Sequence, residues 1–484
     1  MSEAFGTPMK YSQFIDGNFE DGTGTDVFEV VSPSTGNVLG EYHFASPQDV
    51  SRAISSAKKT LPAWKKTSAS QRSITLRAVA DEMRLDRDVL ARQISLELGK
   101  PYAESQKEVD TAAEMFEWAA EEARRLYGRT IPARTPGVVQ TAQLEPMGVV
   151  GAFSGWNAPA ITPSRKISGA LAAGCTIVLK ASEETAGVAL IIAQAAQRAG
   201  VPAGVLNLVF GNPAEIADIL CTSPDVAMIT FTGGTEVGKS LGAKAAAHMK
   251  RATLELGGHA PVVVWKDVDL DKVASSTAAT KFRNAGQVCT SPTRFLVHES
   301  VYAEFCEKFT QHAKKISVGD PLDSTTSMGP LKNQRRLAAI DALVRNAQEA
   351  GAQVLTGGQR KAGPGFFYEP TVIAVKDLCA DVCRIEPFGP VAVIIPIKDA
   401  DEAIGEANRL PFGLASYVFT NDMKLAYRFS TEIESGVVCI NELQASLPET
   451  PFGGYKDSGL GSEGGIEGAR EFLRTKCIRQ GGLA

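Results

Sequence analysis

Short apolar runs alternate with amphipathic stretches between about residues 148 and 257. Each apolar run has the length of a buried strand, and the stretches between them repeat their apolar positions with helical spacing. The predicted strands and helices, in chain order, are 149–153, 163–173, 176–179, 184–199, 205–209, 213–220, 227–231 and 235–248. Strands joined by crossover helices predict a parallel sheet covered by helices. Ligands bind such sheets beyond the carboxyl ends of the strands.

A second alternating block starts at Pro261 and continues to about residue 440. It includes a long predicted helix at 332–350 and predicted strands at 391–396 and 436–440. Before the first block, the N-terminal 45 residues have the pattern of hairpin strands, and residues 46–127 are mostly helical. The simplest arrangement is two α/β lobes with a cleft between them.

The composition is that of an ordinary globular protein, because 44% of the 484 residues are apolar and 22% are charged. This length predicts two or three domains. The net charge of −5 predicts no general attraction to nucleic acid or to acidic membranes. We expect neither a secretory leader nor a membrane span, since no window approaches about 18 continuous apolar residues. The eight cysteines are scattered, which favours reduced thiols in the cytoplasm, and the dispersed histidines argue against a metal site.

Cys289 and Glu255 are the first candidates for chemistry. A cysteine thiolate can add to a carbonyl carbon, and a carboxylate can later activate water against the resulting thioester. Each residue alone is a weak signal. A lone cysteine is more often an inert buried side chain, and a lone glutamate is usually solvated.

An alternative function comes from Gly233 to Ser240, which fits the phosphate-loop pattern G-x-x-x-x-G-K-[ST] between a predicted strand and a predicted helix. In a nucleotide hydrolase Lys239 would bind the phosphates. Glu236 argues against this hypothesis, because it places an acid in the middle of the loop. Glycines at such a turn can still let a nucleotide cofactor approach the backbone. No G-x-G-x-x-G follows any of the predicted strands, so the ordinary dinucleotide fingerprint is absent.

Taken together, the motifs of this chain resemble the aldehyde dehydrogenase superfamily over nearly the full length. The motifs that carry the resemblance are Trp156-Asn157, Lys180 to Glu183, Phe231 to Gly238, Glu255 to Gly258, Asn284 to Cys289, Glu386 to Pro390 and Pro451 to Gly454. Seven motifs in the family's order are far more specific than any one of them.

The resemblance implies an α/β fold with two parallel-sheet lobes, a Rossmann-like cofactor lobe and a catalytic lobe, plus a small β-arm for oligomerisation. The expected domains are an NAD-binding domain at 1–123 and 147–257, a catalytic domain at 258–460 and an oligomerisation arm at 124–146 and 461–484. A homodimer or homotetramer is expected.

The resemblance also implies a function, the NAD(P)-dependent oxidation of an aldehyde to a carboxylic acid. Cys289 would attack the aldehyde, and the side-chain amide of Asn157 with the backbone N–H of Cys289 would hold the oxyanion. The resulting thiohemiacetal would become a thioester, and Glu255 would activate the water that hydrolyses it. Glu255 argues against the related enzymes that pass the thioester to coenzyme A.

NAD is the expected cofactor. In the family the counterparts of Lys180 and Glu183 bond the adenosine ribose, and an acid there accepts from the 2′-hydroxyl and repels a 2′-phosphate, which favours NAD over NADP. Glu386 and Phe388 would position the nicotinamide ribose and ring. Ten further residues are expected to line the cofactor: Phe153, Ser154, Trp156, Gly211, Phe231, Gly233, Gly234, Val237, Leu256 and Gly257.

Within the superfamily the chain is most similar to succinate-semialdehyde dehydrogenases. Arg165, Arg283 and Ser446 align with the positions that clasp the distal carboxylate of the substrate there. Phe452 is a further expected substrate contact.

Two departures from the family pattern favour a different substrate. Gly155 replaces a proline, and Ala158 replaces an aromatic residue that lines the aldehyde tunnel. These two residues resemble instead the aromatic-aldehyde dehydrogenases that act on benzaldehyde, salicylaldehyde or vanillin, so an aryl aldehyde is the alternative substrate. Ser291 stands where several succinate-semialdehyde enzymes carry a second cysteine, so a local disulfide with Cys289 is not expected.

Overall fold

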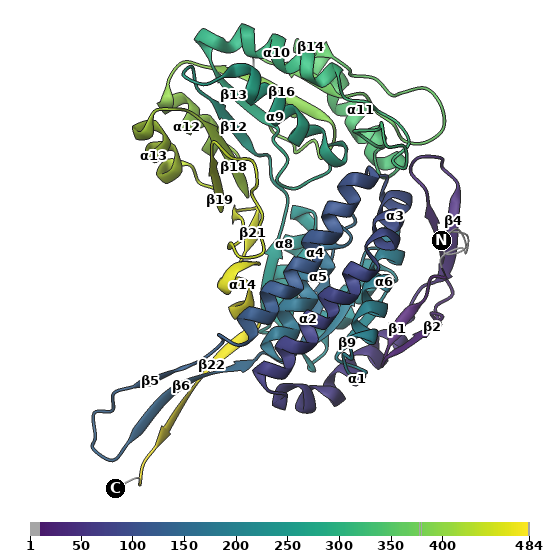
Figure 1. Ribbon diagram of the computed structural model, residues 1–484, viewed down its shortest axis with the longest axis vertical. Helices are drawn as coiled ribbons and strands as arrows, with labels where there is room; N and C mark the ends of the chain where they lie inside the picture. Colours follow the sequence, from purple (N-terminus) through teal and green to yellow (C-terminus); the bar gives the residue numbers. More distant parts are fainter. Residues whose placement is uncertain (1–9, 377, 379, 483–484) are drawn as a thin grey trace.

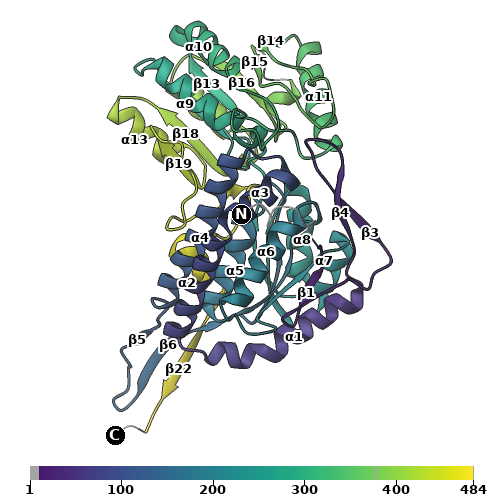
Figure 2. The ribbon, with the colours of Figure 1, turned by 45° about the vertical axis from the view of Figure 1, so that its right-hand side comes forward.

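The computed structural model describes residues 10–376, 378 and 380–482. Two α/β lobes lie one above the other, and a narrow β-arm extends from the lower one (Figures 1 and 2). We call the lobe built around β7 to β11 the first lobe and the lobe built around β12 to β19 the second lobe. This arrangement is the predicted one.

The first lobe contains a mostly parallel sheet in which, among the described residues, eight strands run in the order β2-β1-β9-β8-β7-β10-β11-β21. The central strands β9, β8, β7, β10 and β11 are parallel to one another. The hairpin β1-β2 pairs antiparallel with β9 at one edge, and the short β21 pairs antiparallel with β11 at the other. The chain moves outward from β7 to β8 and β9 and then returns to the other side for β10 and β11, so the strand order switches between β7 and β10. The strand bounds are β1 Gln13–Ile15, β2 Asn18–Glu20, β7 Val149–Phe153, β8 Thr176–Lys180, β9 Leu206–Val209, β10 Val226–Thr232, β11 Arg251–Glu255 and β21 Gly459–Leu460.

Helices cover both faces of this sheet. On one face α1, α7 and α8 pack over a core that includes Val50, Ile216 and Leu241. On the other face α2 to α6 pack over a second core. The helix bounds are α1 Pro47–Lys66, α2 Ala69–Leu85, α3 Arg87–Leu98, α4 Tyr102–Ala123, α5 Ile161–Ala173, α6 Ala186–Arg198, α7 Pro213–Thr222 and α8 Thr235–Ala247.

Complete burial explains why the sequence pattern located these elements. Every residue of β7, β8 and β9 is buried, so these strands are mostly apolar on both faces rather than on one alone. Local signals also set the helix ends. The α1 helix begins with a capping box in which the Ser46 hydroxyl accepts from the Asp49 N–H and the Asp49 carboxylate accepts from the Ser46 N–H.

The second lobe has a sheet in the order β14-β15-β16-β13-β12-β18-β19, in which every neighbouring pair is parallel except β14-β15. Its strands are β12 Pro261–Val264, β13 Arg294–His298, β14 Gln353–Thr356, β15 Thr371–Ala374, β16 Val391–Ile397, β18 Ala415–Phe419 and β19 Val437–Ile440. Its helices are α9 Leu270–Phe282, α10 Tyr302–Lys314, α11 Gln334–Glu349, α12 Ala400–Asn408 and α13 Met423–Glu432. The long helix and the two strands predicted here are confirmed.

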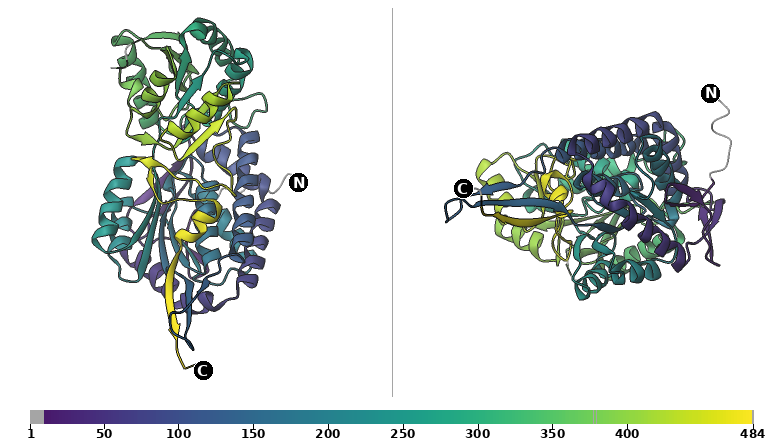
Figure 3. Two further views of the ribbon diagram at one scale, coloured as in Figure 1. Left: turned by 90° about the vertical axis from the view of Figure 1, so that its left-hand side faces the viewer. Right: turned by 90° about the horizontal axis from the view of Figure 1, so that it is seen from below.

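The arm is a small antiparallel sheet of β5 Arg129–Ile131, β6 Val139–Pro146 and β22 Leu473–Gln480 (Figure 3). β22 pairs with β6 along its whole length, which joins segments more than 300 residues apart. The short helix α14 Gly465–Glu471 leads into β22. The remaining short strands are β3 Val27–Val31, β4 Val38–His43, β17 Phe412–Gly413 and β20 Tyr455–Lys456. The domain boundaries given above stay predictions.

Among the described residues, none of the helices is both long and apolar enough to cross a membrane. In the same part of the chain, no group of three or more histidine, cysteine, aspartate or glutamate side chains could hold a metal ion.

Candidate active site

The residues predicted to bind a cofactor gather at the carboxyl ends of the parallel strands of the first lobe. They end or follow β7 (Phe153, Ser154, Trp156), β8 (Lys180, Glu183), β9 (Gly211), β10 (Phe231, Gly233, Gly234) and β11 (Leu256, Gly257). All five strand ends lie at one edge of the sheet because the strands are parallel, and β7 and β10 flank the switch in strand order, where such sheets bind ligands. At this switch the hydroxyls of Ser154 and Thr232 are buried and have no hydrogen-bond partner.

Cys289 follows a strained turn at the end of α9. Asn284, Ala285 and Gly286 all adopt positive φ, at 49°, 52° and 71°. An alanine in this region is strained, and a Cβ on Gly286 would lie 2.1 Å from the carbonyl oxygen of Gly389, so only glycine fits there. Strain of this kind persists where the surrounding structure fixes it, often at functional sites.

The Cys289 side chain is partly buried. Burial raises the pKa of its thiol to about 12, with the negative charges of Glu386 and Glu255 acting in the same direction and Arg165 opposing them. The thiol is therefore protonated at neutral pH in the free protein. Attack on a carbonyl requires that its proton be removed or that a positive charge be brought near it.

The amide of Asn157 lies against the chain that leads to this cysteine. Its Nδ2 donates to the backbone carbonyl oxygen of Gln287 at 3.2 Å, and the backbone carbonyl oxygen of Asn157 accepts from Asn284 Nδ2 at 3.0 Å. The backbone N–H of Cys289 donates to no other residue in the described part of the chain. The second N–H of the Asn157 amide and the N–H of Cys289 are thus available to an oxyanion.

Glu255, the last residue of β11, is 3% exposed, and neither of its carboxylate oxygens has a hydrogen-bond partner among the described residues. Burial raises its pKa well above 4.5, and the nearby charge of Glu463 raises it further, against the opposing effects of Arg165 and Lys166. Glu463 itself accepts from Lys166 Nζ at 2.6 Å. An unpartnered carboxylate with a raised pKa can act as a proton acceptor near neutral pH.

Glu386 and Phe388 come from the second lobe and face the first. Burial raises the pKa of Glu386 to about 7, although the N–H of Gly258 bonds its carboxylate. A Cβ on Gly257 would lie 2.6 Å from the Glu386 carboxylate, so a larger residue here would displace that carboxylate. Phe388 has φ of 43°, and its ring meets Trp156 edge-on at 5.5 Å.

Lys180 and Glu183 form an ion pair just after β8. The Glu183 carbonyl also accepts from the hydroxyl of Tyr42 at 3.2 Å, which fixes the turn on which the acid stands.

Two other predicted cofactor residues are fixed by backbone contacts. Gly211 lies against Ala45, and the Leu256 N–H donates to the carbonyl of Ser458 at 2.9 Å.

The predicted substrate residues separate into two groups. The guanidinium of Arg165 donates to the Ser446 hydroxyl at 2.6 Å and lies 4.8 Å from the centre of the Phe452 ring. Its Nε is buried and has no partner. Arg283, in contrast, is exposed at the end of α9 and bonds neither Arg165 nor Ser446.

Ala158 precedes α5, where its carbonyl accepts from the Thr162 N–H at 3.0 Å.

A family model described as the aldehyde dehydrogenase family matches residues 19–478. The chain belongs to the aldehyde dehydrogenase family. The predicted family, fold class and enzyme class, an oxidoreductase of the aldehyde dehydrogenase type, are thereby confirmed.

Known members of the family are similar over almost their full length. A 4-(hydroxymethyl)benzenesulfonate dehydrogenase of Comamonas testosteroni is 42% identical over 96% of this chain and 97% of its own. An NADP(+) succinate-semialdehyde dehydrogenase of Escherichia coli is 39% identical over 97% and 98%.

Among solved structures, an NADP-dependent enzyme of E. coli has a TM-score of 0.96, with 39% identity over 98% of both chains. A betaine aldehyde dehydrogenase of Staphylococcus aureus in complex with NAD+ has a TM-score of 0.95, with 32% identity over 98% of this chain and 95% of that one.

The phosphate-loop alternative is wrong, and the structure gives the reason. The α8 helix begins at Thr235, so the residues between Gly234 and Lys239 are helical and form no open loop. Lys239 Nζ donates to the Asp457 carboxylate at 2.6 Å and lies 3.9 Å from Glu236. Val237 is exposed on this helix, and a Cβ on Gly234 would meet nothing within 4 Å.

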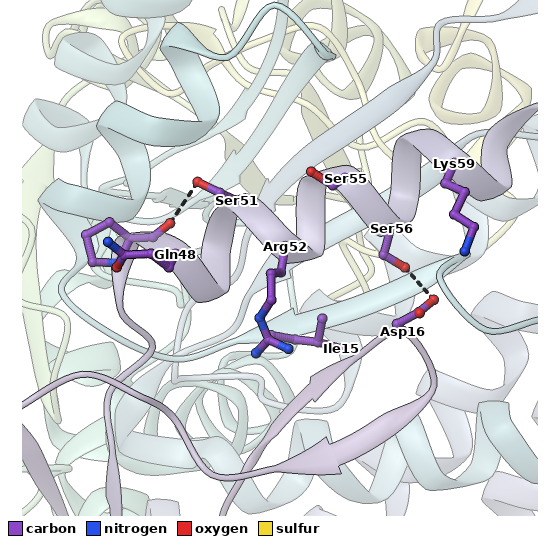
Figure 4. Close-up of a pocket in the computed structure, with 9 residues that line it drawn as sticks. Ile15, Asp16, Gln48, Ser51, Arg52, Ser55, Ser56 and Lys59 are labelled. Atoms are coloured by element: carbon purple, nitrogen blue, oxygen red, sulfur yellow. Dashed lines mark hydrogen bonds between the residues drawn. The ribbon is translucent and has the colours of Figure 1, made fainter.

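A hollow of about 560 Å³ lies away from the active-site residues, between β1 and α1 (Figure 4). Several of its polar groups bond one another or their neighbours. Ser56 donates to Asp16 at 2.7 Å, and Arg52 pairs with Glu20 and Asp49. Nothing in this hollow resembles a reactive group.

Sequence reasoning missed three residues that shape the site. The Gln287 carbonyl accepts from the amides of both Asn157 and Asn284. Lys166 and Glu463 form a buried ion pair beside Glu255 across 297 positions of sequence. Gln287 stands in the motif that ends at Cys289, which was a usable signal, whereas no sequence pattern links Lys166 to Glu463.

Proposed function

We propose that this protein oxidises an aldehyde with a distal anionic group to the corresponding carboxylic acid, using NAD+. The observation that carries the proposal is the buried Arg165, held by Ser446 and Phe452, with a free Nε. Its charge acts on both Cys289 and Glu255, so a carboxylate or sulfonate bound near it would be close to the reacting groups.

The chain's own residues supply each step other than the acceptance of hydride. Cys289 loses its proton and bonds the aldehyde carbon, and the N–H groups of Asn157 and Cys289 hold the oxygen that becomes negative. Bound NAD+ would supply the acceptor for the hydride that leaves this carbon. Glu255 then takes a proton from water, whose oxygen attacks the thioester, and Cys289 leaves as the carboxylic acid forms.

Several features of the first lobe support the dinucleotide. The unpartnered hydroxyls of Ser154 and Thr232 stand at the strand switch, where phosphate or ribose oxygens can bond them. Glu183 supports NAD over NADP, because its carboxylate can accept from a ribose hydroxyl and repels a 2′-phosphate. The relatives include an enzyme named for NADP and a structure with NAD+, so the preference for NAD is argued from Glu183 of this chain.

Glu183→Gln should therefore relax the choice of cofactor. Without the negative charge, kcat/KM with NADP+ should rise by about tenfold relative to kcat/KM with NAD+. The measurement is the ratio of the two values at saturating aldehyde. Glu184→Gln, one residue further along the same turn, is the matched control and should leave the ratio unchanged. An unchanged ratio in Glu183→Gln would remove the argument for NAD.

The size of the substrate is the second question. Ala158 leaves more room than the aromatic residue usual in the family, which favours an aryl group, and one relative is named for an aryl sulfonate. An aromatic aldehyde that also carries an anion satisfies both Ala158 and Arg165. The two candidates are thus an aliphatic semialdehyde such as succinate semialdehyde and an anionic aryl aldehyde such as 4-formylbenzenesulfonate.

Paired substrates separate charge from size. We expect Arg165→Met to raise KM by about tenfold to a hundredfold for succinate semialdehyde and 4-formylbenzenesulfonate, because a hydrogen bond to a charged group contributes about 1.5–3 kcal/mol. KM for butanal and benzaldehyde, which match these substrates without the anion, should change less than twofold. Equal loss with all four aldehydes would show structural damage rather than recognition of charge.

We further propose that the protein forms a homodimer or homotetramer through the arm. In support, β22 is an edge strand of the arm sheet and seven of its eight side chains are exposed, so its edge can pair with another copy. Light scattering of the intact chain gives the number of copies directly.

The cysteines in the described residues are all free thiols, which supports a cytoplasmic location.

A further inference from the structure

Three charged residues at the junction of α3 and α4 contact the two segments that carry Asn157 and Cys289. Lys100 lies in the turn between α3 and α4, and Glu104 and Glu108, four residues apart on α4, share one face of that helix. Lys100 and Glu108 are both buried and form an ion pair with each other. None of the three was predicted to belong to the site.

Glu108 holds the chain that carries Asn157. Its Oε1 accepts from the N–H of Ala160 at 2.8 Å and of Ile161 at 3.5 Å, at the first turn of α5. This helix has no capping side chain of its own, so a carboxylate from α4 satisfies its free N–H groups. Asn157 stands three residues before Ala160 and moves with this turn.

The same cluster holds the chain that carries Cys289. Lys100 Nζ donates to the carbonyl of Asn157 at 3.5 Å, and the Glu104 carboxylate accepts from the N–H of Asn284 at 3.0 Å. Asn284 Nδ2 in turn bonds the carbonyl of Asn157. The cluster therefore contacts both the segment with the oxyanion donor and the strained turn before the nucleophile.

We propose that Glu108, with Lys100, is a positioning residue that places the Asn157 amide against the oxyanion formed at Cys289. The inference rests on the proposed function, in which Cys289 attacks and Asn157 donates. Removing an oxyanion donor costs about 10²–10³ in rate, and a displacement of about 1 Å can cost a large part of that. Glu108 touches neither substrate nor cofactor, so its effect would be confined to steps that develop negative charge on oxygen.

Glu108→Gln tests this with the whole enzyme and p-nitrophenyl acetate as probe, without cofactor. Cys289 sulfur bonds the acetyl carbon, p-nitrophenolate leaves, and water later releases acetate, so the burst of nitrophenolate reports the oxyanion step. A glutamine presents either its NH₂ to Lys100 or its NH₂ to the Ala160 N–H, so one contact is lost in both orientations. The burst rate should fall by about tenfold to a hundredfold.

Glu97→Gln is the matched control. Glu97 is also a buried glutamate and accepts from the N–H groups of Gly187 and Val188 at the start of α6, at 3.0 and 3.3 Å, away from Asn157 and Cys289. Its burst rate should stay within twofold of the parent, and Tm should fall in both variants. Alkylation of Cys289 by iodoacetamide, which releases iodide and forms no oxyanion, should keep its rate in both.

An unchanged burst in folded Glu108→Gln, or an equal loss in Glu97→Gln, would overturn the positioning role while leaving the proposed function in place. If Cys289→Ser retained the burst, the proposed function itself would fall. Should Glu108→Gln not fold, Glu108→Asp keeps the charge but shortens the reach to Ala160, and a burst equal to the parent's would then overturn the proposal.

Discussion

Cys289→Ala should abolish aldehyde oxidation while leaving cofactor binding intact. Losing the nucleophile of a covalent mechanism costs about 10⁴-fold in kcat or more, because the remaining groups act only through it. Formation of NADH from each of the four paired aldehydes measures the loss, and titration calorimetry with NAD+ measures binding. The thiol has no structural partner that the alanine would orphan, so Tm should change little.

Cys306→Ala is the control for this prediction. Cys306 is another buried thiol in the second lobe, on α10, and its removal should leave turnover unchanged apart from a modest loss of stability. If Cys289→Ala kept more than about 1% of the parent's turnover under the same conditions, another nucleophile would have to be sought.

Glu255→Gln should stop the reaction after its first half. The thioester would still form, because that half uses Cys289 and Asn157, but water would lack its base. Rapid mixing should show a burst of about one NADH per active site, followed by a steady rate about 10²–10⁴-fold below the parent's. Loss of the burst together with the steady rate would mean that Glu255 acts before the thioester rather than after it.

Glu255→Gln should also make the folded protein more stable than the parent at pH values above about 5. The pKa of Glu255 is raised in the folded state, so the folded protein holds this proton more tightly than the unfolded chain does. Below the unfolded pKa near 4.5 the carboxyl is protonated in both states, and the variant and parent should have similar Tm. As pH rises above 4.5 the parent loses stability relative to the glutamine variant, so the difference in Tm should widen from about pH 5 to pH 8.

Glu406→Gln should have the opposite effect on Tm at neutral pH and destabilise the protein. Glu406 is also buried, but its carboxylate accepts from Arg294 and Arg409, so neutralising it leaves buried positive charge without its partner. Its Tm should fall at neutral pH. A fall in Glu255→Gln as well would contradict the view that Glu255 is held at a cost to stability.

The elements of the first lobe were predictable because their signals are local. Buried parallel strands are continuous apolar runs, and 149–153 matches β7 residue for residue. The phosphate-loop pattern is also a local signal, and it gave a wrong alternative because it does not fix the backbone conformation. Eight residues can match in sequence, but whether they form a loop depends on where the helix starts, and α8 starts at Thr235.

The pairing of groups in the site was not predictable from local pattern. Resemblance to a family suggested Cys289, Glu255 and Asn157, but nothing along the chain places Asn157 against Gln287, 130 positions later. The left-handed backbone of Ala285 was equally hidden, since alanine rarely adopts it and only the surrounding contacts hold it there.

The contacts that join the two lobes at Asn157 end on main-chain oxygens. Asn157 donates to the carbonyl of Gln287, and Asn284 donates to the carbonyl of Asn157. A carbonyl is present whatever the side chain, so the first contact places no demand on the residue at position 287, whereas the second requires the asparagine at position 284. A chimera that joins this first lobe to the second lobe of a relative with an asparagine at the position of Asn284 would keep the geometry of the oxyanion donor, together with Ala158 and Arg165 of the first lobe.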